Sequence, residues 1–371
     1  MVETKTERKS TRAAFTTALP ELAIRHNVLV VDTDTGSVTP TPEMEYLNVG
    51  IAESAALGLA AGAEHLGWRA LVCTFAAFSA SRAFEFIKLD IAYPRRRVCI
   101  VGTHGGVSGG WLGPTHHCAE DLALMNALPN MRVVVPADAR QTVSLLEQCL
   151  EYDGPTYLRL GRKDSPVFSG LAEPELGVPQ EVRAGQDVAL VATGPEMLLT
   201  ALEVARGLTA EGCRAQVINA HTVDPESAAA VNDLIADECR WLVTLEEAWP
   251  SGGMGAQVAA AAGARGIRWL PIGLDGFLAP GSHADLLAAG GLDAASVLRR
   301  VLAFTGELQP TGKGTHMTTE CLSCAGDVQI QADSYPGEIV SCPKCSAELE
   351  IFSTAPLKLA IAPESEEDWG E

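Results

Sequence analysis

Residues 47–82 read LNVGIAESAALGLAAGAEHLGWRALVCTFAAFSASR, and the architecture of the chain is clearest in this stretch. Its Ala- and Gly-rich part predicts a helix that carries one carboxylate, Glu53, in its first turn. A short apolar strand follows and runs into two phenylalanines, Phe75 and Phe78. Helix followed by buried strand is one repeat of an α/β sheet. An acid with two aromatic side chains suits a heterocyclic ring that has a nitrogen to protonate.

The bulk composition is that of a globular protein with two or three domains. The chain has 371 residues, of which 47% are hydrophobic, and a net charge of -20. That charge argues against a nucleic-acid partner, because binding phosphates requires clustered cations and the only cationic run is at 95–97. No signal peptide and no apolar run of membrane-spanning length is found. We therefore expect a cytoplasmic protein without a membrane partner.

Apolar runs and helical patterns alternate along the first part of the chain. Strands are predicted at 28–35, 70–75, 98–104, 132–138 and 155–160, with helices between them. This alternation predicts a doubly wound, mostly parallel sheet with helices on both faces. Ligands of such sheets lie at the carboxyl ends of the strands, where Asp34, Phe75, His104 and Asp138 are expected.

A second α/β domain is predicted after a less regular stretch, from about 165 to 184, that resembles a linker. Its predicted strands are at 188–194, 215–225, 241–247 and 266–274. SGGMG at 251–255 lacks the Lys-Ser/Thr of a phosphate loop, so we expect a tight turn that opens a helix. The predicted limits of the two domains are 1–170 and 180–305.

The ten cysteines fall into two groups. Six are scattered through apolar or helical segments, as reduced thiols of a reducing compartment are: Cys73, Cys99, Cys118, Cys149, Cys213 and Cys239. The other four form the pattern C-x2-C-x17-C-x2-C at Cys321, Cys324, Cys342 and Cys345. This spacing predicts a small β-rich ribbon around Zn²⁺, in which the metal replaces a core that so short a segment cannot build.

The order of motifs resembles the C-terminal half of transketolase over roughly residues 10–304. The motifs are NVGIAE (48–53), TFAAF (74–78), GTHGG (102–106), GPTHH (113–117), ALPNMRVVVPAD (127–138) and VTLEE (243–247) with GGMG (252–255). The family's diphosphate and magnesium signature, GDG with a later Asn, does not occur. The resemblance implies one half of a split enzyme. An N-terminal transketolase subunit would hold Mg²⁺ and the diphosphate of thiamine diphosphate, in an α2β2 heterotetramer.

The same resemblance implies roles in cofactor binding. Glu53 would hydrogen-bond N1′ of the cofactor's pyrimidine ring, and Phe75 and Phe78 would stack against that ring. Asp34 matches an aspartate that approaches the cofactor across the subunit interface. Taken alone, Glu53 would be only a helix-starting acid and the two phenylalanines only core residues.

Histidines of the glycine-rich segments match the family's substrate-facing residues. The resemblance implies that His104 and His116 hydrogen-bond the hydroxyl and carbonyl oxygens of the donor and stabilise the oxygen where charge develops. His117 is a third imidazole in the same segment, and no role is assigned to it.

Two departures from the family bear on the acceptor. Transketolases that act on sugar phosphates usually have an acidic pair in GEDGPTH, whereas this chain has Trp111 and Leu112. Val135 stands where many members carry a phosphate-binding arginine. Loss of these charged groups weakens recognition of a hydroxylated, phosphorylated acceptor. We therefore expect an unphosphorylated acceptor that is less polar near its aldehyde.

Residues 317–371 resemble the amino-group carrier proteins of the LysW type. The resemblance rests on CLSC, CPKCSAELEIF, PLKLAIAP and the final ESEEDWGE. It implies that the side-chain carboxylate of Glu371 forms an amide with the α-amino group of a biosynthetic intermediate. The acidic domain would then present that intermediate to basic patches on the carrier's modifying enzymes. An acidic disordered tail is the simpler alternative for such a run.

The junction at 306–316 is predicted to be a linker, and it contains a further signal. Gly-Thr-His-Met at 314–317 is what adjoining KpnI and NdeI restriction sites would encode in frame. Our hypothesis is therefore an engineered fusion of two proteins.

These observations predict a transketolase-type transferase (EC 2.2.1 class). It would move a two-carbon ketol unit from a ketose phosphate to a semialdehyde attached at Glu371. One alternative is a β subunit of a 2-oxoacid dehydrogenase or a relative of deoxyxylulose-phosphate synthase, and the pair His104 and His116 favours transketolase over both. The other alternative is a non-catalytic zinc-ribbon scaffold.

Overall fold

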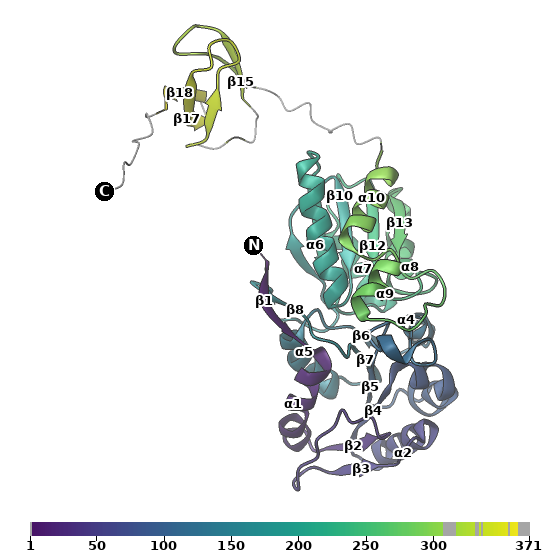
Figure 1. Ribbon diagram of the computed structural model, residues 1–371. Helices are drawn as coiled ribbons and strands as arrows, with labels where there is room; N and C mark the ends of the chain where they lie inside the picture. Colours follow the sequence, from purple (N-terminus) through teal and green to yellow (C-terminus); the bar gives the residue numbers. More distant parts are fainter. Residues whose placement is uncertain (1, 307–316, 331–333, 335–336, 355–356, 363–371) are drawn as a thin grey trace. The chain divides into compact units, whose positions relative to one another are not determined.

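A computed structural model describes residues 2–306, 317–330, 334, 337–354 and 357–362 (Figure 1). The chain divides into two compact units, residues 1–307 and 308–371. Most of the predicted linker at 306–316 and the whole end of the chain, including Glu371, lie outside the described residues. Within the described part, none of the helices combines the length and the apolar character that crossing a membrane requires.

The first sheet of the larger unit has six strands, all parallel, in the order β3-β2-β4-β5-β7-β6. The strands are β2 (Val28–Asp32), β3 (Tyr46–Asn48), β4 (Arg69–Phe75), β5 (Val98–Thr103), β6 (Arg132–Val134) and β7 (Thr156–Leu160). The helical segments between them are α1 (Thr11–Arg25), α2 (Glu53–His65), η1 (Phe78–Arg82), α3 (Phe84–Phe86), η2 (Ile87–Ala92), η3 (Gly110–Leu112), α4 (Asp121–Asn126) and α5 (Ala139–Glu151). Because all six strands run in one direction, their carboxyl ends meet at one edge.

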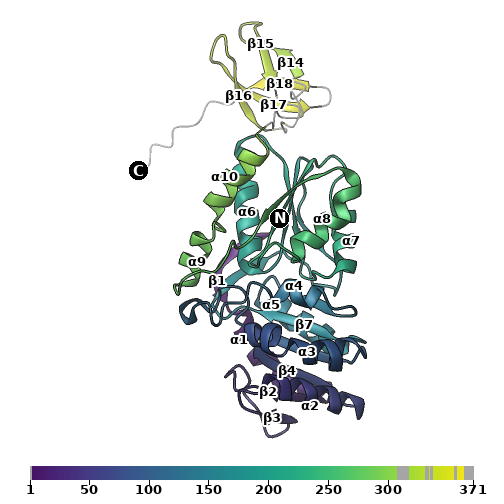
Figure 2. The same ribbon diagram turned by 90° about the vertical axis from the view of Figure 1, so that its right-hand side faces the viewer.

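Helices cover both faces of this sheet, as predicted. Successive strand residues point to opposite faces, so each strand contributes to two cores. Leu71 of β4 packs with Phe15 of α1 and Leu145 of α5, whereas Val72 packs with Leu57 of α2. Figures 1 and 2 show α1 and α5 on one side of the sheet and α2 and α3 on the other. The nearly continuous apolar sequence of the strands reflects this burial on two faces.

The second sheet has five strands in the order β13-β12-β10-β11-β9, with only β9 antiparallel to its neighbour. The strands are β9 (Gln180–Arg183), β10 (Val188–Ala192), β11 (Ala215–Asn219), β12 (Trp241–Leu245) and β13 (Arg268–Ile272). The helices are α6 (Pro195–Ala210), α7 (Pro225–Leu234), α8 (Met254–Ala262), η4 (Gly263–Arg265), α9 (His283–Ala289) and α10 (Ala294–Phe304). Helix α8 begins inside SGGMG, so the predicted turn that opens a helix is confirmed.

The stretch from about 165 to 184, which we predicted to be a linker, is not one. It contains β8 (Ser165–Ser169), which pairs with β1 (Glu3–Lys9), and it ends in β9 of the second sheet. We predicted a linker because the segment is rich in Pro, Gly and Glu, which are uncommon in strands. Both strands are short edge strands, in which proline is tolerated because one side of the strand is unpaired. The segment therefore belongs to the folded unit.

The two α/β domains of the larger unit are joined by backbone hydrogen bonds and a shared core. Val135 N–H donates to the carbonyl of His221 at 2.8 Å, and Val223 N–H donates to the carbonyl of Val133 at 2.9 Å. One continuous cluster of buried apolar side chains extends from α2 to α7 and α8. The second domain is therefore placed firmly against the strand ends of the first.

The described residues of the smaller unit form two antiparallel sheets. One is the hairpin β14 (Met317–Glu320) and β15 (Asp327–Ile330), and the other has the order β16-β17-β18. These last strands are β16 (Ile339–Ser341), β17 (Glu348–Thr354) and β18 (Leu357–Ile361). Its buried core is small and includes two of the predicted ligands, Cys321 and Cys342. Two α/β domains and a β-rich ribbon confirm the predicted fold class.

Candidate functional site

Glu53 lies at the first position of α2, just after β3, and only 2% of its surface is exposed. Its Oε2 accepts a hydrogen bond from Nη1 of Arg82 at 3.0 Å. The positive end of the helix dipole also favours a carboxylate at this position. The Arg82 side chain, by contrast, is 52% exposed, and its guanidinium lies 4.6 Å from the centroid of the Phe78 ring. The acid is therefore buried beside a cation that reaches solvent.

Four predicted residues form one aromatic cluster at the carboxyl edge of the sheet. The ring of Phe75 lies 4.4 Å from that of His104, 5.8 Å from that of His116 and 5.7 Å from that of Phe78, between centroids. The Phe78 and His116 rings are 5.2 Å apart. All four pairs meet edge to face, a favourable geometry for aromatic rings. A hollow of about 420 Å³ opens beside Phe78 and Arg82. This volume is large enough for a ring-sized ligand.

Both histidines are oriented by the threonine that precedes them. Thr103 Oγ1 lies 3.1 Å from His104 Nδ1, and Thr115 Oγ1 lies 2.9 Å from His116 Nδ1. Within the residues that the structure describes, no hydrogen bond involves Nε2 of either ring. The Thr-His dipeptide in each motif thus holds Nδ1 and leaves Nε2 for a ligand.

His104 is held neutral by its surroundings. Burial is the largest cause, and the nearby cations Arg12 and Arg162, with His116, add to it, so that the pKa of His104 falls to about 3. Its backbone is left-handed, with φ of 62°, which is uncommon for a residue with a β-carbon. At neutral pH the ring can therefore donate or accept a hydrogen bond without carrying charge.

The remaining predictions are placed less centrally. Asp34 follows β2 at the same edge, but it is exposed and its Oδ1 accepts from Nδ2 of Asn48 at 3.2 Å. Asp138 instead caps α5, because its side chain accepts from the N–H of Gln141. Nε2 of His117 lies 2.9 Å from the carbonyl oxygen of Gly110. Arg82 connects Glu53 with Phe78 of the aromatic cluster, and Asp34 lies outside that cluster.

Three arginines of the site were missed in the sequence. Arg82 pairs with Glu53, and Arg12 and Arg162 lower the pKa of His104. Arg162 also lies over the exposed ring of Trp111, with 5.2 Å between its Cζ and the ring centroid. A lone arginine carries no local signal, because its partners come from distant parts of the chain.

The four predicted zinc ligands lie together in the smaller unit. Their sulfur atoms are all within 4.8 Å of one another. Two of the Sγ–Sγ distances, Cys321 to Cys345 and Cys324 to Cys342, are each 3.7 Å. A tetrahedral zinc site with Zn–S bonds of about 2.3 Å requires edges of about 3.8 Å, so the sulfur atoms fit Zn²⁺. The other six cysteines are free and buried.

The two Cys-x2-Cys turns are equivalent in their backbone. The N–H of Ser323 donates to Sγ of Cys321, and the N–H of Lys344 donates to Sγ of Cys342, each at 3.4 Å. Each turn ends in a left-handed residue, Ala325 with φ of 52° and Ser346 with φ of 59°. Backbone N–H groups directed at sulfur stabilise thiolate charge and orient the ligands.

Family models of known proteins match three stretches of the chain. Residues 7–167 match the family model of the transketolase pyrimidine-binding domain, and residues 177–297 match that of the transketolase C-terminal domain. Residues 319–364 match the globular domain of the LysW-like α-aminoadipate carrier protein. The similarity predicted from the motifs is thus confirmed.

Individual relatives are similar over most of their length. A putative transketolase C-terminal section of Methanocaldococcus jannaschii is 32% identical, over 79% of this chain and 96% of the relative. One of the subunits of the apulose-4-phosphate transketolase of Phocaeicola vulgatus is 33% identical, with the same coverage. A solved structure described as a split gene transketolase, inactive β4 tetramer, is 36% identical, with a TM-score of 0.69 over 80% of this chain and 98% of that one.

The low pKa of His104 predicts how this ring titrates. Because the pKa falls to about 3, the ring stays neutral from pH 8 down to pH 5, and its NMR shifts in histidine-labelled protein should not move in this range. Arg12→Gln removes one neighbouring cation and should raise the pKa. A His104 signal that titrates near the ordinary histidine value of about 6.5 in the unsubstituted protein would contradict this account.

The sulfur geometry predicts a metal-dependent ribbon. Cys345→Ser removes one thiolate ligand, and we expect the chain to lose zinc to a competing chelator at about tenfold lower chelator concentration, or lower still. Metal per chain and amide exchange in residues 317–354 measure this. Cys213→Ser, at a buried thiol of the larger unit, is the matched control and should keep its zinc. Equal zinc retention in both variants would refute the site.

Proposed function

Because the chain belongs to the transketolase family, as the C-terminal section of a split enzyme followed by a LysW-like zinc ribbon, we propose that it transfers a two-carbon ketol unit from a ketose phosphate to a carrier-bound semialdehyde. The semialdehyde would be attached through its α-amino group to the side chain of Glu371. The C2–C3 bond of the ketose breaks and releases a shortened aldose phosphate. A new C–C bond forms at the aldehyde carbon, whose oxygen takes up a proton, so the reaction needs no oxidant or reductant.

The observation that carries the proposal is the buried carboxylate of Glu53 beside the aromatic cluster. The family implies thiamine diphosphate with a metal, and that cofactor supplies the carbon nucleophile for ketol transfer. Glu53 would share a proton with the pyrimidine ring, and Phe75 and Phe78 would contact the ring faces. Asp34, exposed at the same edge, would approach the cofactor from this subunit. Burial of Glu53 supports this role because it excludes water from the shared proton.

A second polypeptide would complete the cofactor site. The sequence lacks the diphosphate and magnesium signature, so an N-terminal transketolase subunit would hold Mg²⁺ and the diphosphate in an α2β2 heterotetramer. The 36% identical relative that is described as an inactive β4 tetramer supports this requirement.

His104 and His116 would bind the oxygens of donor and acceptor through Nε2. A neutral imidazole can donate its Nε2 proton to a carbonyl oxygen, or accept one from a hydroxyl, without placing a second charge in the site. Arg12 and Arg162 would attract the phosphate of the donor. In the described part of the chain, neither guanidinium forms an ion pair with a carboxylate, which supports their availability for an anion.

The surroundings of the histidines support a carrier-bound acceptor. Trp111 is 58% exposed where related enzymes have an acidic residue, and Val135 is buried where they have an arginine. These apolar groups disfavour a free sugar phosphate as the acceptor. The LysW-like ribbon in the same chain supports an amide-linked amino-acid semialdehyde instead. A flexible tether would raise the local carrier concentration to roughly the millimolar range.

The role of Glu53 predicts a selective loss of activity. In the complex with the N-terminal subunit, Glu53→Ala should reduce ketol transfer by about 100-fold or more, because the proton-sharing group is removed. Subunit assembly, measured by size-exclusion chromatography, should not change. The matched control is Glu64→Ala, which removes the other Glu–Arg cluster of α2, with Arg96 and Arg97. Wild-type turnover in Glu53→Ala would rule out the proposed role.

The carrier hypothesis predicts where the product is found. When the complex is given a ketose phosphate and the semialdehyde-loaded carrier, intact-mass measurement should show a two-carbon ketol unit added to the peptide that ends in Glu371. Glu371→Gln cannot be loaded through its side-chain carboxylate and should show no such addition. Pyruvate in place of the ketose phosphate should not support transfer. A free amino-acid product formed equally well without the carrier would contradict the hypothesis.

A further inference from the structure

A carboxylate of the second domain reaches into the segment that carries the histidines. This segment, residues 104–118, is called the histidine loop below. Glu247 follows β12, and only 13% of its side chain is exposed. Its Oε1 accepts from the N–H of Val107 at 2.7 Å and lies 3.0 Å from Nε2 of His283, the first residue of α9. Val107 is three residues from His104, so Glu247 contacts the loop close to the substrate-facing ring.

The loop is shaped to receive this carboxylate. Gly106 has φ of 62°, and a β-carbon at this position would lie 2.4 Å from Oε1 of Glu247. Any other residue would therefore both strain the backbone and displace the carboxylate. Gly106 and Cys118 also exchange two backbone hydrogen bonds, of 2.9 and 2.8 Å, which close the base of the loop.

The far end of the loop is tied to the same segment of the second domain. Nη2 of Arg159 donates to the carbonyl of Cys118 at 3.0 Å and to the carbonyl of Glu247 at 2.8 Å. The N–H of Trp249 donates to the carbonyl of Ala119 at 2.8 Å. Both ends of the histidine loop are thus attached to residues 247–249.

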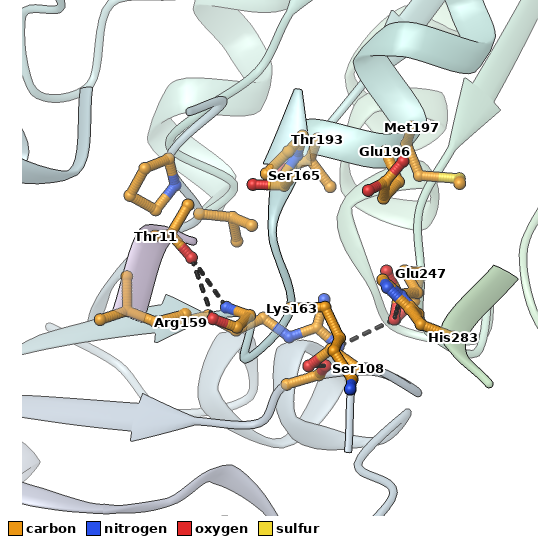
Figure 3. A pocket seen from close by; sticks show the side chains of 17 residues that line it. Thr11, Ser108, Arg159, Lys163, Ser165, Thr193, Glu196, Met197, Glu247 and His283 are labelled. Atoms are coloured by element: carbon orange, nitrogen blue, oxygen red, sulfur yellow. Dashed lines mark hydrogen bonds and ion pairs between the residues drawn. The ribbon is translucent and has the colours of Figure 1, made fainter. Parts of the chain in front are cut away.

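Charged neighbours keep Glu247 and His283 paired. Burial would raise the pKa of Glu247, but His283 and Arg159 outweigh it and lower that pKa. Burial likewise opposes the protonated form of His283, and Glu247 and Glu196 outweigh it and raise the pKa of His283. Figure 3 shows Glu247 and His283 side by side at the wall of a cavity of about 40 Å³, which Glu196, Lys163 and Arg159 also line. The remaining charged neighbour is Arg8, which is paired with Glu196.

We propose that Glu247, supported by His283, is a positioning residue that fixes the histidine loop from the second domain. This inference rests on the proposed function, because it assumes that His104 and His116 act on the substrate. His104 is held in an unfavourable left-handed conformation, which persists only while its surroundings hold the loop. Without Glu247, the N–H of Val107 loses its acceptor and the loop relaxes, whereas Glu53 and Phe75 keep their places on α2 and β4.

The test compares Glu247→Ala with Glu246→Ala in the complex with the N-terminal subunit. Glu246 is the matched control, since it is an adjacent buried carboxylate that accepts from Met254 N–H and Gly255 N–H at the start of α8. We expect amide exchange in residues 105–112 to accelerate about tenfold or more in Glu247→Ala only. We also expect kcat to fall about tenfold or more while the affinity for thiamine diphosphate stays within about twofold.

Glu247→Gln separates charge from hydrogen bonding, because its amide oxygen can still accept from Val107, and its exchange should stay within about threefold of the wild type. If Glu247→Ala does not fold, the comparison can still be made between Glu247→Gln and His283→Ala. Glu247→Ala and His283→Ala are the two variants expected to loosen the histidine loop, and they are called the loosening variants below. Unchanged exchange in residues 105–112 of the loosening variants would overturn the positioning role. So would faster exchange with an unchanged kcat. Absence of ketol transfer in the wild-type complex would refute the proposed function instead, and the exchange data would still decide whether Glu247 holds the loop.

Discussion

The site depends on keeping one carboxylate out of water. A residue that is 2% exposed can hold a charged carboxylate only if nearby groups compensate for lost hydration, and Glu53 has the amino end of α2 and the guanidinium of Arg82. Arg82 is half exposed, so its charge remains hydrated while it pairs with the buried acid. The pair is thus asymmetric, with a buried acid and a half-exposed cation. Under the proposed function, a ring nitrogen of the cofactor would be a further partner of Glu53.

Two positively charged side chains lie at the same edge of the sheet, although the chain as a whole is negatively charged. The net charge is -20, yet Arg12 and Arg162 lie near His104 without carboxylate partners among the described residues. Burial is the main reason that the imidazole is neutral, and the two positive charges add to this effect and also attract anions. An anionic donor would offset their mutual repulsion, whereas a protonated histidine would add to it. Under the proposed function, these charges would favour an anionic donor beside the neutral ring of His104.

The features that could be predicted from the sequence are those that depend on residues close together in the chain. Strands buried on both faces appear as apolar runs, and Phe75 and His104 could be placed because they end such runs. The short strands β1, β3 and β8 were missed, since their residues become strands only through pairing with distant partners. The contact of Glu247 with Val107 spans 140 residues of sequence, and no local pattern records it. VTLEE was recognised as a family motif. Its second glutamate, Glu247, contacts Val107 only because the two domains pack against each other.

The zinc ribbon follows a different rule from the rest of the chain. Among its described residues, the buried core consists of six side chains, two of which are cysteines, so apolar burial alone contributes little to its stability. A four-thiolate metal site supplies folding free energy locally, because all four ligands lie within the ribbon. Such a module keeps its structure whichever polypeptide it is joined to, by evolution or by engineering. The site in the larger unit has the opposite character, since Glu53, the two histidines and Glu247 come from two domains. Under the proposed function, such a ribbon would present its attached group to the enzyme without needing the enzyme's core for its own fold.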